Sequence, residues 1–145
     1  MSDIRKFAVS PTARLHLRDA GDELMYTEDG KEIAVNVYGP GSKQYAKAQA
    51  AQQNRMIEKL KRKGQSNQSA EQMAKEKAEF LSDCTAGFEN LEFDGLTGEA
   101  LAIAVYSDQE IGFIADQVNK FTGDWASFLP KSATNSASTS GTLPG

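Results

Sequence analysis

The chain has 145 residues but only one cysteine, Cys84, and one histidine, His16. A single cysteine forms no disulfide within the chain and builds no multi-cysteine metal site, which fits a reducing cytosol. Cys84 falls on an apolar helical face, so we expect a buried thiol with a raised pKa. His16 falls on the exposed side of an alternating segment. The sequence therefore indicates no cysteine–histidine pair for nucleophilic catalysis.

Long apolar runs are also missing. Charged side chains interrupt the first 20 residues at Asp3, Arg5, Lys6, Arg14, Arg18 and Asp19. No apolar stretch there reaches the length of a signal peptide or a membrane span. We expect neither secretion nor a membrane partner.

Motifs that carry chemistry are incomplete. The segment Gly39-Pro40-Gly41-Ser42-Lys43 lacks the Gly-x4-Gly-Lys-Ser/Thr spacing of a phosphate loop and reads as a plain turn. The carboxylates Glu89, Glu92 and Asp94 do not follow the Asp-x-Asp-x-Asp-Gly pattern of a calcium loop. We therefore expect a protein that is not an enzyme and that holds no cofactor or metal.

Charge of each sign is concentrated in a different segment, although the net charge is only −4. Residues 42–64 hold seven Lys or Arg against Glu58, and residues 69–110 hold ten Asp or Glu against Lys75 and Lys77. This separation suits a basic nucleic-acid face, two neighbouring helices that attract each other, or a head-to-tail contact between copies. The acidic total favours the last two.

The first third of the chain has the period of β-strands. Residues 12–18 and 33–37 alternate between apolar and polar side chains, and residues 24–27 fit a short strand between them. Asp29-Gly30 suits the tight turn of a hairpin. We predict a small antiparallel sheet over residues 12–38.

Three helices are predicted next. Ser42 can cap a helix that runs to residue 63 and stops at Gly64, Ser69 with Gln72 forms a capping box for residues 69–88, and Thr97 can begin a short helix. The first helix has a thin apolar stripe, which indicates that it projects from the domain or packs through alanines. That stripe consists of Tyr45, Ala48, Met56 and Leu60.

The clearest helical periodicity comes last. Ser107 with Glu110 resembles a capping box, and the following spacings of three, four and seven keep the apolar residues on one face up to Pro130. We interpret this face as core first, with a partner-binding patch at its far end. Its members are Ile111, Ile114, Ala115, Val118, Phe121, Trp125, Phe128 and Leu129.

These elements predict an α+β fold: a small N-terminal antiparallel sheet followed by a mostly helical bundle of about four helices. The domain would cover residues 1–130, with the sheet at about 12–38 and the helices at about 42–129. Residues 132–142 are all Ser, Ala, Thr, Asn or Gly. Such side chains bury too little apolar surface to offset their ordering entropy, so residues 131–145 are predicted to be a disordered tail.

The order of these features resembles that of a known family. A small N-terminal sheet leads through VYGPGSKQY at 37–45 into a helix rich in alanine and lysine, and the last helix contains IADQV at 114–118 and GDW at 123–125. Over about residues 3–130 the chain is similar to tail assembly chaperones of long-tailed, siphovirus-type bacteriophages.

The resemblance implies a protein of the infected bacterial cytoplasm that binds and solubilises the tape measure protein and recruits tail tube subunits. It also implies a homo-oligomer on the client, absence from the mature virion, and a longer frameshift product of the same gene. The boundary near Lys131 would suit the start of that extension.

Two sets of side chains are candidates for partner contact. Cations near the end of the first helix would supply charge contacts: Lys59, Lys61, Arg62 and Lys63. The last helix would supply the apolar contact through Ile111, Ile114, Val118, Phe121, Trp125 and Phe128.

Two other functions stay open. One is a structural virion protein that assembles into a ring, such as a tail terminator or a head–tail connector. The other is a small nucleic-acid-binding regulator that uses the cations of residues 59–63, although no aromatic residues interleave them.

Overall fold

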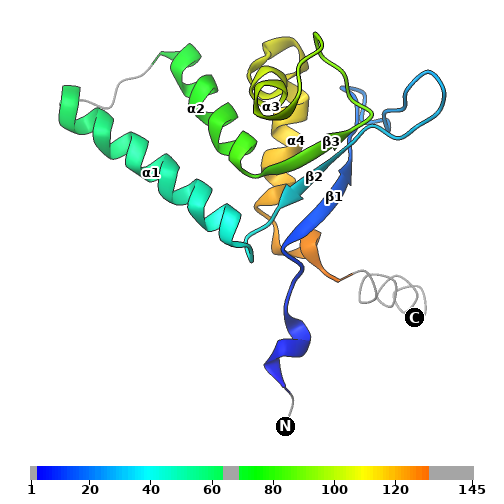
Figure 1. The fold of residues 1–145 in the computed structure, drawn as a ribbon, viewed down its shortest axis with the longest axis horizontal. Helices are drawn as coiled ribbons and strands as arrows, with labels where there is room; N and C mark the ends of the chain where they lie inside the picture. Colours follow the sequence, from blue (N-terminus) through cyan, green and yellow to red (C-terminus); the bar gives the residue numbers. More distant parts are fainter. Residues whose placement is uncertain (1–2, 64–68, 131–145) are drawn as a thin grey trace.

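The computed structural model describes residues 3–63 and 69–130, which form a three-stranded antiparallel sheet and four α-helices (Figure 1). The predicted α+β class is confirmed. The predicted helix stop at Gly64 and the predicted disordered tail lie outside the described residues.

The sheet has the order β1-β2-β3, with β1 at Thr12–His16, β2 at Ala34–Tyr38 and β3 at Thr85–Glu89. Both pairs are antiparallel, and the register between β2 and β3 shifts at Asn36/Val37. The prediction that the sheet ends at residue 38 is wrong, because its third strand comes from residues predicted to finish a helix.

The segment between β1 and β2 forms a narrow loop. Residues 24–27 are not a strand; two isolated bridges, Arg18 to Leu24 and Tyr26 to Glu32, draw its two sides together. At its tip the Gly30 amide donates to the Thr27 carbonyl over 3.0 Å, and Gly30 has a φ of 85°. The turn expected at Asp29-Gly30 is thus formed. Of its two residues, Gly30 has the left-handed conformation and Asp29 does not.

Three of the predicted helix starts are confirmed, including the one at Thr97, which precedes a helix that begins at Gly98. Helix α1 spans Lys43–Lys63, and the Ser42 hydroxyl accepts from the Tyr45 amide at 3.1 Å. Helix α2 spans Ala70–Asp83, and the Ser69 hydroxyl accepts from the Gln72 amide at 3.1 Å. A serine oxygen satisfies an amide that the first turn of a helix leaves unpaired.

The C-terminal part is divided more finely than predicted. Helix α3 spans Gly98–Ser107, the 3-10 turn η2 spans Gln109–Ile111, α4 spans Gly112–Thr122, and the 3-10 turn η3 spans Trp125–Phe128. The expected single helix from residue 107 to 129 is wrong.

The start of this region also differs from the prediction. Ser107 ends α3 and donates its hydroxyl to the Ile103 carbonyl, while Asp108 accepts from the Glu110 amide and caps η2. The capping function expected at Ser107 therefore belongs to Asp108.

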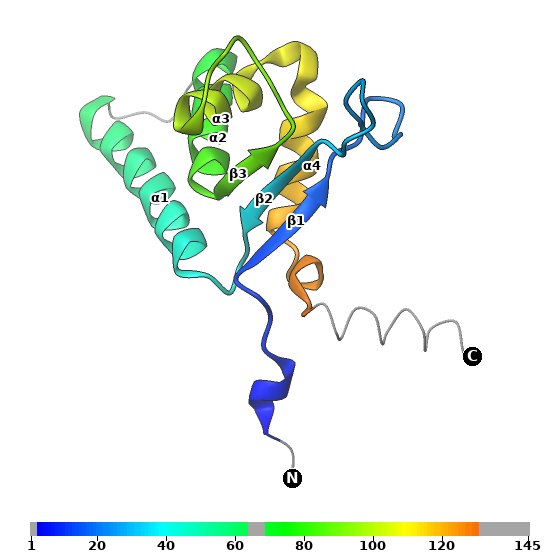
Figure 2. The same cartoon turned by 45° about the vertical axis from the view of Figure 1, so that its right-hand side comes forward.

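The core lies between one face of the sheet and helices α2, α3 and α4 (Figure 2). Side chains from every one of these elements are fully or almost fully buried, among them Val35, Val37, Leu81, Val105 and Val118. Helix α1 packs mainly against α2 and lies at the margin of the molecule (Figure 1). This placement leaves much of the α1 surface in contact with solvent.

Candidate protein-binding surface

The six apolar residues predicted to contact a partner do not form one exposed face. Ile114, Val118 and Phe128 are buried in the core. Ile111 and Phe121 are partly buried and pack against the same core. Trp125 alone of the six is largely exposed, at 58%.

The separation of Trp125 from Phe128 comes from a change in chain direction. Helix α4 ends at Thr122, with Gly123 at its C-cap, and the Asp124 carboxylate caps η3 by accepting from the Ala126 amide at 3.0 Å. Phe128 then packs beneath the end of β2, where its ring lies only 2.5 Å from the position of a Cβ on Gly39. The ring fills the space that a side chain at Gly39 would need.

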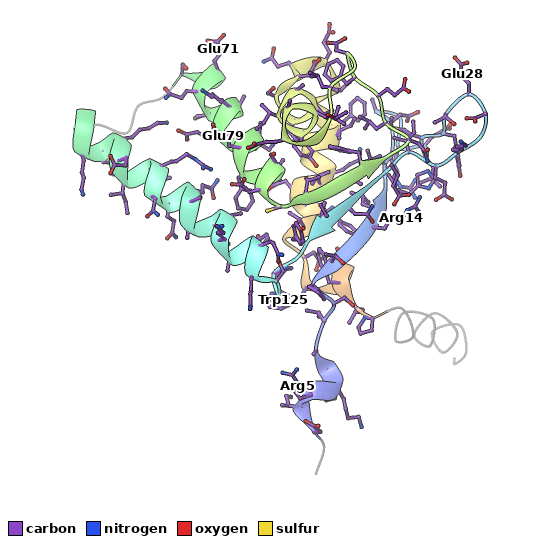
Figure 3. All side chains as sticks on the ribbon, in the orientation of Figure 1. Arg5, Arg14, Glu28, Glu71, Glu79 and Trp125 are labelled. Carbon is purple, nitrogen blue, oxygen red and sulfur yellow. The ribbon has the colours of Figure 1, made fainter. Side chains whose placement is uncertain are left out.

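The predicted cations lie at the far end of α1 and are used in part within the chain. Lys59 forms an ion pair with Glu76 on α2, and its side chain is only 14% exposed. Arg55, which the prediction did not include, pairs with Glu79 at 3.4 Å, on the side of α2 that faces α1 (Figure 3). Lys61 is exposed. The side chains of Arg62 and Lys63 lie outside the described part of the structure.

These ion pairs belong to a narrow seam between α1 and α2. Near the start of α1 the seam is apolar: Ala48 is buried, and the Tyr45 ring packs edge-on to Phe80 with centroids 5.8 Å apart. Farther along it is charged, through Arg55 and Lys59. The expected attraction between oppositely charged neighbouring helices is observed at these two ion pairs.

Helix α1 also carries large apolar side chains that are about half exposed. Met56, Ile57 and Leu60, here termed the α1 stripe, are between 44 and 57% exposed, and Met73 of α2 is also exposed. The sequence pattern groups Met56 and Leu60 with Tyr45 and Ala48 in one thin stripe and predicts that the helix projects from the domain or packs through alanines. The structure agrees with that prediction, because Ala48 is buried whereas Met56 and Leu60 are exposed.

The single cysteine and the single histidine of the chain both pack against other parts of the domain. Burial, with a smaller contribution from Asp83, raises the pKa of the Cys84 thiol to about 12, so the thiol is neutral at physiological pH. His16 is partly buried instead of exposed: its Nε2 lies 2.9 Å from the Met25 carbonyl oxygen, and its ring packs edge-on to Tyr26. Among the described residues, no group of His, Cys, Asp and Glu is arranged to hold a metal ion.

Comparisons with protein-family models, with curated proteins and with solved structures find no match to this chain. No helix in the described part of the chain combines the length and the apolar character that crossing a membrane requires.

Proposed function

We propose that this chain is a non-catalytic tail assembly chaperone of a long-tailed bacteriophage and that it binds its client through α1. The observation that carries the proposal is the α1 stripe: three adjacent large apolar side chains stand exposed on a marginal helix. Clustered exposed apolar side chains on a soluble domain are typical of a protein-binding surface. The family itself rests on the sequence resemblance.

The client proposed from that resemblance is the tape measure protein, a long amphipathic helix. A helix of this kind buries its apolar face against a matching apolar surface, with anchors spaced three and four residues apart. Ile57 and Leu60 have that spacing, and Lys61 lies beside them for contact with acidic side chains. Many copies along one client would hold it firmly even if each contact is weak.

The apolar contact is therefore assigned to the α1 stripe, and the buried members of the last helix are assigned to the core. Trp125 stays within the proposed contact surface because it is exposed. The proposal also includes recruitment of tail tube subunits, a frameshift-extended form, action in the cytoplasm of the infected host and absence from the finished virion.

The nucleic-acid alternative receives less support from the same geometry. Two cations of α1, Arg55 and Lys59, already face carboxylates of α2. A carboxylate next to a cation reduces the positive potential that would attract a phosphate backbone. We expect no retention on DNA at physiological salt.

The test is co-expression with the tape measure protein of the same phage. The variant Ile57→Ser/Leu60→Ser removes the centre of the α1 stripe and should weaken client binding about tenfold or more, because central apolar anchors dominate such contacts. The readout is the amount of tape measure protein that stays soluble and co-purifies with the chain.

The matched control is Leu24→Ser, which removes an exposed leucine from the loop between β1 and β2. It should leave client recovery unchanged. Equal client recovery with the α1 variant and the wild type would contradict the assignment to α1. Finding the chain in purified virions by mass spectrometry would instead support the structural virion protein.

A further inference from the structure

A groove lies between strand β3, helix α3 and the segment of residues 90–97 that joins them, with a volume of about 970 Å³. The side chains that line it are mainly apolar, and several of these side chains are partly exposed to solvent. The apolar lining includes Phe88, Leu91, Phe93, Leu96 and Leu101. The groove is large enough to receive two bulky side chains.

Tight turns shape the groove in advance. Asp94 and Gly95 both have positive φ, 52° and 69°, and the Leu96 amide donates to the Phe93 carbonyl across this turn at 3.0 Å. At the other end of the segment the Asn90 amide group donates to the Glu32 carbonyl at 2.8 Å. A site that is formed before binding loses less conformational freedom when a ligand enters.

The groove also has a charge of one sign. Its lining contains Asp83, Glu92 and Glu99 and, within the described structure, no lysine or arginine. A ligand that carries apolar side chains together with cations would complement both properties.

The N-terminal segment of the same chain has this combination. The 3-10 turn η1, Ile4–Phe7, exposes its two large apolar side chains, Ile4 at 75% and Phe7 at 69%, and holds Arg5 and Lys6 between them. Residues three apart lie on the same side of a 3-10 turn, so Ile4 and Phe7 form one apolar face.

The turn is held away from the body. The chain is first anchored after it, where the Ser10 amide donates to the Phe128 carbonyl at 2.7 Å and the Gly39 amide donates to the Pro11 carbonyl at 2.9 Å. From there η1 extends away from the body of the domain, at the end opposite to the segment of residues 90–97 that joins β3 to α3 (Figure 1). Arg5 of this turn is labelled in Figure 3. The apolar face of η1 is largely exposed to solvent, and no residue of the turn is buried.

We infer that η1 of one copy docks in the β3–α3 groove of a second copy, with Ile4 and Phe7 in the apolar lining and Arg5 and Lys6 beside its carboxylates. Two different surfaces meet in this contact, so each copy keeps a free turn at one end and a free groove at the other. Such a contact joins copies head to tail. The inference goes beyond the proposed function, because the contact forms without a client and does not use α1.

Sedimentation velocity of the purified full chain, without client and over a concentration series, tests the contact. The wild type should form species larger than a dimer as concentration rises. Ile4→Ser/Phe7→Ser should weaken association about tenfold or more, because burial of these two side chains drives it. Both side chains are exposed, so the fold should be unaffected; Leu24→Ser is the matched control.

A second variant tests the groove itself. Leu96 lines the groove and is exposed, so Leu96→Lys places a cation among the apolar lining without removing a core side chain. Circular dichroism melts establish that the variant is folded, and it should sediment as a monomer.

Mixing the variants identifies the geometry. Ile4→Ser/Phe7→Ser retains an intact groove and Leu96→Lys retains an intact η1 turn, so the mixture should form one-to-one pairs and nothing larger. Charge reversal supplies a further test. The chain with Arg5→Glu/Lys6→Glu should no longer self-associate, because its turn then carries the same sign of charge as the groove. Adding Glu92→Lys/Glu99→Lys to that same chain should restore self-association.

A monomeric wild type at every concentration, or a Leu96→Lys variant that associates as the wild type does, would overturn the inference. Because no client is present, such a result leaves the proposed function standing. Conversely, loss of client binding by the α1 variant with normal self-association separates the two surfaces.

Discussion

At the scale of single residues, the contact between Gly39 and Phe128 explains how the C-terminal turn closes on the sheet. Phe128 is fully buried, and its ring occupies the place where a side chain at position 39 would begin. The short segment Gly39-Pro40-Gly41 resembles a phosphate loop only in composition. Its first glycine is needed because the backbone and an aromatic ring approach each other closely there.

Gly39→Ala should therefore destabilise the protein. The added methyl group would overlap the Phe128 ring, and overpacking a core costs about 1–3 kcal/mol. Urea unfolding followed by circular dichroism measures the change. Gly87→Ala is the matched control, because its added Cβ meets no atom within 4 Å. A similar midpoint for the two variants would contradict this explanation.

At the scale of secondary-structure elements, one carboxylate connects all three strands. Glu89 on β3 accepts from Arg14 Nε on β1 at 3.1 Å and from Asn36 Nδ2 on β2 at 2.8 Å. These side chains lie on the face of the sheet away from the helices. The Asn36 hydrogen bond, together with Arg14, holds the pKa of Glu89 below its ordinary value of 4.5.

A pKa that is lower in the folded than in the unfolded state means that ionised Glu89 stabilises the fold. This stabilisation is fully present above pH 4.5 and is lost as pH falls through the folded-state pKa. At neutral pH, Glu89→Gln should lower the free energy of unfolding by about 1 kcal/mol or less, because the group is partly exposed. The difference from wild type should shrink below pH 4.5. Urea titrations at both pH values measure it, and a difference independent of pH would exclude this role.

The serine-capped helix starts are predicted correctly, whereas elements that depend on distant partners are not. Ser42 and Ser69 mark helix starts because each cap is made within three residues. Strand β3 was assigned to a helix because Phe80, Leu81, Cys84 and Phe88 keep helical spacing. Its extended conformation is stabilised by pairing with β2, about 50 residues earlier in the chain.

At the scale of the whole molecule, the sheet and the helices depend on each other. Strands β1 and β2 pair directly, but their buried face is covered by α2, α3 and α4, which all follow residue 69. An isolated two-stranded hairpin is at best marginally stable in water. The N-terminal half of the chain therefore lacks the partners that its apolar residues need.

A fragment of residues 1–63 should consequently be unfolded, although it contains two of the three strands and all of α1. We expect poor dispersion in its amide NMR spectrum and little helix by circular dichroism, because α1 alone buries few apolar side chains. The full chain under identical conditions is the control. A cooperative thermal transition of the fragment would contradict this dependence.

For the candidate binding surfaces, too, the sequence pattern identified some features and the tertiary structure decided others. The sequence identified the segregated charges and the apolar residues of the C-terminal region, but periodicity alone does not distinguish a face that packs on the core from one that faces solvent. The structure buries Ile114 and Val118 and exposes Met56 and Ile57. No local pattern marked the β3–α3 groove, because its walls come from a strand, a helix and the segment between them.

The sequence by itself determined the α+β class, the starts of α1, α2 and α3, the serine caps of α1 and α2, and the burial of Cys84, since these depend on neighbouring residues and on composition. Only the tertiary structure decided the third strand, the break between α4 and Trp125, and the outward direction of the α1 stripe. Each of these depends on contacts between segments far apart in the chain, such as Phe128 against Gly39 and Lys59 with Glu76. Neither segment by itself has a hydrophobic periodicity that would reveal such a contact.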